Sequence, residues 1–349
     1  MAQRIRIGII GAGTNTRKVH IPNLQALEEV HIVEVANRSP ISAQKVADEF
    51  HIPVVRNHWQ EIIESPEVDA IVIGTWPNLH CEASCMALQA DKHVLCEARM
   101  AMNESEARTM LQAAYKHPNC ISQIAPSPFT LHADLTLLHM LDTNEIGTPR
   151  FFRFDYQTPP LVPLGGELHW RRNKLYSGTN IMVLGIIYES LLRWFGPAEW
   201  VNAHAEVINN RAIDPGTQQE VEVEVPDYLS VQMKTTSGVV GSLFLHELSN
   251  QPRQSSIRIY GDKGFIHLDF EPGGKLYRSI NSAGEMQEVR IPAGQLGKWR
   301  AEEEFINSIR GLEDIELTTF TTGVEYMKFT QAVNDSFNNN GERITIHVG

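Results

Sequence analysis

Two glycines near the start of the chain stand where backbone amides could hold a phosphate group. They follow an apolar run at residues 5–10, and Thr16 takes the third position of the spacing, where glycine or alanine is usual. A first glycine permits a tight turn, a second lets backbone N–H groups approach a pyrophosphate, and the following helix directs its positive end at the charge. The pattern predicts a dinucleotide-binding turn for a nicotinamide cofactor, with a plain strand-to-helix turn as the alternative. The turn residues expected to contact the cofactor are Gly11, Gly13, Thr14, Asn15 and Thr16.

Cofactor choice is expected to depend on the end of the second strand, at residues 31–36. NAD enzymes place an acid there that accepts from the ribose hydroxyls, but this chain has Asn37, Arg38 and Ser39, and Glu34 comes too early. Without a carboxylate to repel it, a 2′-phosphate could bind Arg38 and Ser39. The segment therefore favours NADP over NAD.

The first part of the chain alternates short apolar runs with helical patterns. This alternation predicts a doubly wound, parallel α/β sheet of the Rossmann type. Asn103 is a typical helix cap before one of the helices. The expected strands are residues 31–36, 70–73, 93–96 and 120–124, and the expected helices are residues 19–27, 42–50, 81–90 and 104–117.

The pattern changes after Pro126 and Pro128, which mark a domain boundary. We expect a Rossmann domain at residues 1–125 and an α+β domain at residues 126–349 with an open, mainly antiparallel sheet. The segments expected in this second domain are helices at 131–141 and 180–195, a polar loop at 158–174, and strands at 150–154, 229–234, 238–245, 256–260, 265–269 and 288–291.

Composition restricts the class of ligand. The formal net charge is −12 and there is no long Lys/Arg run, which argues against nucleic acid or an anionic membrane and for a small molecule. No apolar stretch approaches the roughly 20 residues of a spanning helix, and no leader precedes the first strand, so a cytoplasmic protein is expected. The cysteines lack the paired spacings of a zinc site, which predicts free thiols and no metal. They are Cys81, Cys85, Cys96 and Cys120.

Several motifs occur in an order that resembles one family. Residues 8–13 read GIIGAG, residues 74–80 read GTWPNLH, residues 92–97 read KHVLCE, and residues 191–196 read LLRWFG. Together they resemble the glucose-fructose oxidoreductase, inositol dehydrogenase and MocA group (Gfo/Idh/MocA) over nearly the whole chain. The resemblance implies a Rossmann domain, an open-sheet domain and hydride chemistry on sugars or cyclitols. Further cofactor contacts implied by it are Thr75, His80, Glu97 and Arg171, and Trp76, which stands where the family usually has proline, is added to them as a candidate.

This chain departs from the family pattern at the residues that exchange protons in the reaction. Where the family has Glu-Lys-Pro, it has Glu97 followed by Ala98 and Arg99, and the positions of the family's Asp and His carry Val183 and Ile187. An aliphatic side chain cannot exchange a proton, so the family's usual alcohol dehydrogenase mechanism cannot apply unchanged.

Five polar residues are candidate replacements, each with a structural alternative. Arg99 could hold a substrate oxygen or only brace its loop, and it is a poor base. His169 could titrate near neutrality or be an ordinary loop histidine. Asn180, expected one turn before Val183 on the same helical face, could bind a hydroxyl or cap the helix. Tyr188 and Glu189 could act in catalysis, or Tyr188 could pack with its hydroxyl satisfied.

Two other features leave alternatives open. Trp76 could flank the nicotinamide side of the site or be a core aromatic. The apolar residues Val239, Gly241, Leu243 and Leu245 fit either a partner surface of a homodimer or homotetramer or an ordinary core face.

Three functions fit the sequence. The first is an NAD(P)-dependent oxidoreductase acting on a sugar-like compound, with His169 or Tyr188 handling the proton. The second is a hydrolase or lyase that cleaves glycosides by transient oxidation with a retained cofactor. The third is a family member that binds cofactor without catalysis.

Overall fold

The computed structural model describes residues 3–270, 274–280 and 285–347. These residues divide into two compact units. Unit 1 comprises residues 1–126 and 300–327, and unit 2 comprises residues 127–299 and 328–349. The second boundary falls inside one long helix, α10 (Phe320–Asn338). Residues 300–327, which the sequence pattern placed with the second domain, thus group with unit 1.

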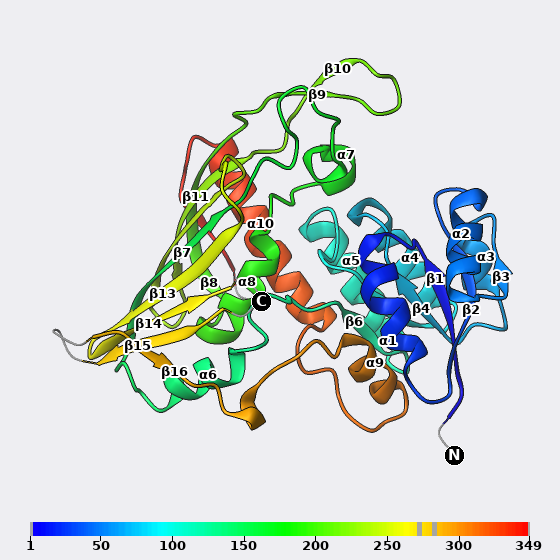
Figure 1. Cartoon of the computed structure of the whole chain (residues 1–349), viewed down its shortest axis with the longest axis horizontal. Helices are drawn as coiled ribbons and strands as arrows, with labels where there is room; N and C mark the ends of the chain where they lie inside the picture. Colours follow the sequence, from blue (N-terminus) through cyan, green and yellow to red (C-terminus); the bar gives the residue numbers. More distant parts are fainter. Residues whose placement is uncertain (1–2, 271–273, 281–284, 348–349) are drawn as a thin grey trace. The chain divides into compact units, whose positions relative to one another are not determined.

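Unit 1 is built on a parallel sheet of six strands in the order β3-β2-β1-β4-β5-β6 (Figure 1). This confirms the expected doubly wound sheet. The four residues of β4 are all buried, as expected for a continuous apolar run in a parallel sheet covered on both faces. The strands are β1 (Ile5–Ile10), β2 (Val30–Ala36), β3 (Val54–Val55), β4 (Ala70–Ile73), β5 (His93–Cys96) and β6 (Ser122–Ile124).

Helices cover this sheet, and one of them comes from the far end of the sequence. Helix α1 packs beside α9, and α4 packs beside α5. Phe305 and Ile306 of α9 are fully buried in the same apolar cluster as the β1 side chains. Asn103 caps α5 by accepting from the Glu106 N–H, as its position predicted. The helices are α1 (Ile21–Gln25), preceded by a π-helical turn η1 (Thr16–His20), α2 (Pro40–Phe50), α3 (Trp59–Glu64), α4 (Pro77–Gln89), α5 (Glu104–Lys116) and α9 (Ala301–Ile309).

Unit 2 is built on a sheet of nine strands in the order β16-β15-β14-β13-β7-β12-β11-β8-β17. The pairing is antiparallel except between β7 and β12, so the mainly antiparallel expectation is confirmed. The strands are β7 (Pro149–Gln157), β8 (Ala198–Glu206), β11 (Tyr228–Thr235), β12 (Val240–His246), β13 (Gln254–Gly261), β14 (Gly264–Asp269), β15 (Leu276–Ile280), β16 (Gln287–Val289) and β17 (Ile344–Thr345), and a separate hairpin pairs β9 (Arg211–Ile213) with β10 (Glu220–Glu222).

One face of this sheet is covered by helices and the other is open. Figure 1 shows α8 lying along the sheet. Leu243 and Leu245 are fully buried, and a Cβ at Gly241 would meet the Phe152 ring at 2.2 Å. The apolar alternation of β12 therefore belongs to the core and not to the open face. The helices of unit 2 are α6 (Asp134–Asp142), α7 (Lys174–Ser177), α8 (Leu184–Phe195) and the later part of α10, with 3-10 turns η2 (Trp170–Arg172) and η3 (Ala293–Gln295).

The helix expected at 180–195 begins later than the sequence suggests. Met182 has φ +44°, which breaks the helical path, and α8 starts at Leu184 with Val183 at its N-cap. Asn180 and Val183 therefore do not share a helical face, and that expectation is wrong. Asn180 also does not cap α8, because its side chain donates to the Ser177 carbonyl.

Candidate functional site

The glycine turn after β1 has the shape that a phosphate cradle requires. Gly11 has φ +82°, and a Cβ there would lie 2.5 Å from the Thr75 methyl group. Gly74 explains the unusual third position, because a Cβ on it would lie 2.0 Å from the Thr16 hydroxyl. That hydroxyl donates to the Gly11 carbonyl at 3.2 Å. Thr16 thus fits the turn and braces it, since the residue facing it has no side chain.

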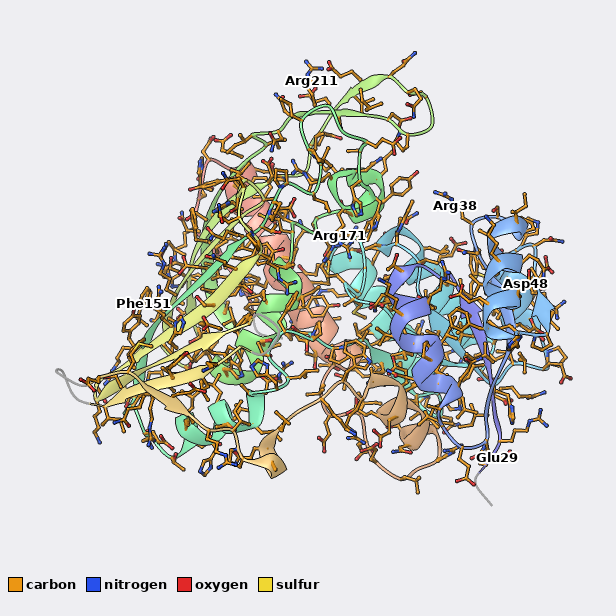
Figure 2. The ribbon with its side chains drawn as sticks, viewed as in Figure 1. Glu29, Arg38, Asp48, Phe151, Arg171 and Arg211 are labelled. Atoms are coloured by element: carbon orange, nitrogen blue, oxygen red, sulfur yellow. The ribbon has the colours of Figure 1, made fainter. Side chains whose placement is uncertain are left out.

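The ends of β2 and β4 carry a cation and an aromatic ring. Arg38 is exposed, and its guanidinium lies 6.0 Å from the centre of the Trp76 ring. Trp76 is half-buried at the N-cap of α4, so it is not a core aromatic. Ser39 uses its hydroxyl to cap α2, and the Asn37 side chain accepts from the Arg38 N–H. Arg38 is therefore the side chain at this edge with a charge available to a ligand (Figure 2).

Glu34, the acid in β2, is hydrogen-bonded to other residues of unit 1. Its carboxylate accepts two hydrogen bonds from Arg56, both at 2.8 Å, and one from Ser65. Burial raises its pKa, but these partners outweigh that effect and lower it. Glu34 is fixed in the protein interior, which agrees with its early position in the strand.

A buried histidine joins two carboxylates from distant parts of unit 1. His20 Nε2 lies 2.9 Å from Glu97 Oε1, and His20 Nδ1 lies 2.5 Å from Glu302 Oε1. Glu97 directly follows β5, and Glu302 lies in the first turn of α9. Asn15 of the glycine turn also donates to Glu97, and Asn23 donates to Glu302. We call His20, Glu97 and Glu302 the charge cluster.

The electrostatics keep all three members of the charge cluster ionised. Burial lowers the pKa of His20, but hydrogen bonds to Glu302 and Glu97 raise it to about 10. Burial raises the pKa of Glu97, and the His20 bond and charge reverse this and lower it to about 2. The pKa of Glu302 is lowered by the same histidine against its burial. The cluster is an imidazolium between two carboxylates.

His80 and Arg99 lie in the interior beside the turn. His80 is fully buried, with Nδ1 3.0 Å from the Arg99 carbonyl and Nε2 3.1 Å from the Thr75 carbonyl. Burial lowers its pKa, so the ring is neutral and donates to one carbonyl. Arg99 is 2% exposed. His80 therefore ties the segment after β4 to the segment after β5, which suits a positioning role.

In unit 2, the candidate residues on the long loop surround η2. His169 Nδ1 accepts from the Arg171 N–H at 3.2 Å, and the Arg171 guanidinium lies 4.3 Å from the Trp170 ring centre. Burial and the Arg171 charge both lower the pKa of His169. At neutral pH the ring is uncharged with Nδ1 occupied as an acceptor, so its proton is on Nε2. Figure 2 labels Arg171 close to α7.

A second charged group anchors this loop. Arg172 is 2% exposed, with Nη1 3.4 Å from Asp227 Oδ2 and 3.5 Å from Glu247 Oε2. Asp227 also accepts from the backbone N–H groups of Ile208 and Asn209. Burial raises the pKa of Glu247, with Arg172 opposing it. Arg172, Asp227 and Glu247 thus connect the loop to the start of β11 and the end of β12.

The remaining candidates of unit 2 are buried and already bonded within it. The Tyr188 hydroxyl accepts from the Ala198 N–H at 2.7 Å, and its ring stacks on Phe329 at 3.7 Å. Glu189 accepts from the Ser127 N–H and from Arg193. Asn180 is 1% exposed. The contacts of Tyr188 and Glu189 therefore hold α8 in the interior of unit 2.

The sequence reasoning missed His20, Glu302 and Arg172 as residues of interest. His20 carried a local signal, because it stands in the first helical turn after the glycine turn. Glu302 had none, since it lies 282 residues away from its partner.

Within the described residues, no group of three or more His, Cys, Asp or Glu side chains is arranged to hold a metal ion. No helix in the described ranges is both long and apolar enough to cross a membrane. The four cysteines are free thiols.

Comparison with known proteins agrees with this geometry. Residues 5–124 match a family model described as an oxidoreductase family with an NAD-binding Rossmann fold, and residues 135–267 match the GFO/IDH/MocA C-terminal domain. The chain is 25% identical over 304 residues to the dTDP-3,4-didehydro-2,6-dideoxy-alpha-D-glucose 3-reductase of Saccharopolyspora spinosa, covering 84% of each. It is also 25% identical over 316 residues to the 1,5-anhydro-D-fructose reductase of Ensifer adhaerens, covering 84% of this chain and 92% of that one.

Solved structures share the fold over the whole length. Levoglucosan dehydrogenase in complex with NADH superposes with a TM-score of 0.85 at 19% identity, covering 99% of this chain and 100% of that one. At this identity the likeness concerns the fold.

Proposed function

Because the chain belongs to the Gfo/Idh/MocA family of oxidoreductases, we propose that it transfers a hydride between a nicotinamide cofactor and a sugar, cyclitol or related polyhydroxy compound. The observation that carries this proposal is the turn at Gly11, where a side chain would be strained and would strike Thr75. A diphosphate needs that open backbone approach. Relatives named for sugar substrates, the two reductases above, support the substrate class.

The residues of unit 1 proposed to hold the cofactor fall into two sets. The glycine turn, Thr14, Asn15 and Thr16 would bind the diphosphate. Thr75, Trp76 and Glu97 at the ends of β4 and β5, with His80 beneath them, would shape the rest of the site, and Arg171 of unit 2 is proposed as a further contact. Arg38 would bind a 2′-phosphate, which supports the proposal that NADP is preferred over NAD. Asn37 and Ser39 would hold Arg38 in place.

Proton handling needs residues of this chain other than the family's lysine, aspartate and histidine. The bound cofactor supplies the acceptor or donor of hydride, while the substrate oxygen loses or gains a proton. We propose His169 for that proton, since Nε2–H of a neutral ring is a donor suited to a carbonyl oxygen that is being reduced. Arg99, Tyr188 and Asn180 are proposed to support the site from the interior of their units, where each is buried.

The test is cofactor binding followed by a substrate panel. Purified protein is titrated with NAD, NADP and their reduced forms, then incubated with sugars, cyclitols and ketosugars while reduced nicotinamide is followed by absorbance. We expect binding and a change in absorbance, lost in His169→Ala. Glycoside cleavage without net absorbance change would favour the redox-neutral hydrolase or lyase. Cofactor binding without any product would favour a non-catalytic protein.

We also propose that the protein is a homodimer or homotetramer, joined through the open face of the unit 2 sheet. Phe151, Tyr260 and Phe265 stack along that face with ring centres 5.8 and 5.5 Å apart, and Figure 2 shows Phe151 on the side of the sheet away from α8. Next to them lies a groove of about 750 Å³ lined by charged pairs such as Arg153 with Asp155. A second copy would cover this aromatic surface. Sedimentation should then give a mass of two or four chains, reduced to one by Tyr260→Glu.

A further inference from the structure

The charge cluster lies at the edge of the sheet where parallel α/β folds bind dinucleotides. Glu97 follows the carboxyl end of β5, which pairs with β4, and β4 pairs with β1 and its glycine turn. Ligands of doubly wound sheets bind outside the carboxyl ends of the strands, at the point where the strand order reverses. In this sheet that point lies between β1 and β4.

The three members differ in their access to that edge. The side chain of Glu97 is 16% exposed, whereas those of His20 and Glu302 are 0% and 1% exposed. Asn15, in the turn itself, donates to Glu97. Glu97 is therefore the member of the cluster that a ligand at this edge could contact, and the charges of His20 and Glu302 act on it from the interior.

The ionised cluster has more negative charges than positive ones. Two carboxylates and one imidazolium sum to −1, and burial keeps solvent from screening this charge as it would at the surface. Two hydrogen bonds, one to Glu97 and one to Glu302, fix the His20 imidazole between the acids. Removing the charge of either carboxylate would make the three groups neutral.

A nicotinamide ring has a positive charge when oxidised and none when reduced. A fixed negative charge beside it attracts only the oxidised form. We propose that the charge cluster of His20, Glu97 and Glu302 shifts the binding preference of this site toward the oxidised cofactor over the reduced one. This inference rests on the proposed function, because it requires that a nicotinamide cofactor binds. Glu302 is a positioning and charge-setting residue, since it contacts His20 and not the ligand edge.

The experiment compares dissociation constants of both redox forms in matched glutamate-to-glutamine variants. Glu302→Gln removes one buried charge while keeping a side-chain oxygen that can accept from His20. Glu67→Gln is the control, because Glu67 pairs with Arg6 before the amino end of β4, at the opposite end of the strands. Calorimetry measures the oxidised form and fluorescence measures the reduced form. We expect Glu302→Gln to reduce the preference for the oxidised form about two- to fivefold, and Glu67→Gln to leave it unchanged.

The possible results distinguish an electrostatic role of Glu302 from a structural one. Equal weakening of both redox forms in Glu302→Gln would show a structural role and overturn the inference, and so would an unchanged ratio. If that variant does not fold, Glu97→Gln is measured for the same loss of preference, and Glu302→Asp, which keeps the charge, should retain the wild-type ratio. Failure of the wild-type protein to bind either form would overturn the proposed function instead.

Discussion

Arg38 lies just after the second strand of the Rossmann sheet, with its guanidinium over the Trp76 ring. A charge-assisted hydrogen bond contributes about 1.5–3 kcal/mol, and solvent exposure reduces that figure. We therefore expect Arg38→Ala to weaken NADP binding about tenfold while changing NAD binding little. Arg108→Ala is the control, since Arg108 pairs with Glu104 on α5. If the binding of both cofactors is weakened equally, Arg38 stacks on the cofactor and does not bind the 2′-phosphate.

The charge cluster should give a characteristic dependence of stability on pH. The pKa of His20 is raised from 6.5 to about 10, so its contribution is complete below pH 6.5 and is lost as the pH rises through 10. The pKa of Glu97 is lowered from 4.5 to about 2, so its contribution is complete above pH 4.5 and is lost as the pH falls through 2. We expect the difference in melting temperature between wild type and His20→Gln to be largest near pH 6 and to narrow toward both pH 3 and pH 10. A difference that does not vary with pH would show that His20 is not charged.

Arg172 anchors the loop before α8 to Asp227 and Glu247. Removing one partner of a buried ion pair typically costs about 3–5 kcal/mol, because the other charges stay buried. Arg172→Met would leave Asp227 and Glu247 facing each other. We expect a clear loss of thermal stability and faster hydrogen exchange at residues 166–178.

The matched control for Arg172 is an arginine in an exposed pair. Arg211 lies 3.7 Å from Glu220 with both side chains more than half exposed, so Arg211→Ala should change stability by less than about 0.5 kcal/mol. Unchanged exchange in Arg172→Met would show that the loop is held by its other contacts.

The elements also show which parts of the fold a sequence can predict. The apolar runs of β4 and β5 and the cap at Asn103 are local signals, and each element formed where its residues placed it. The start of α8 was misplaced because Met182 has a positive φ, a conformation that a methionine in the sequence does not indicate. The role of Thr16 could not be predicted either, because its fit depends on Gly74, on another strand.

The charge cluster shows the same limit at longer range. Its electrostatics require Glu302, which the chain brings to unit 1 only after residues 127–299 of unit 2. Short motifs predicted a nicotinamide cofactor, whereas the carboxylates that contact His20 come from segments distant in the sequence.

Unit 1 is completed by residues 300–327, which follow most of unit 2 in the sequence. Residues 300–327 bring Phe305 and Ile306 into its core, and the Thr318 carbonyl accepts from the N–H of Ile124, the last residue of β6, at 2.9 Å. Loss of one buried phenylalanine typically costs about 3–5 kcal/mol, which is a large share of the stability of a domain. A fragment of residues 1–126 would lose all these contacts together.

We therefore expect the 1–126 fragment to lack a cooperative melting transition and to bind no cofactor. The same fragment joined by a flexible linker to residues 300–327 should recover both properties, measured by circular dichroism and by the rise in melting temperature on adding cofactor. Because the recovered fragment contains Glu302, His20 again has both carboxylates. A 1–126 fragment that melts cooperatively and binds cofactor would instead make the amino-terminal segment an independent domain, with residues 300–327 only attached to it.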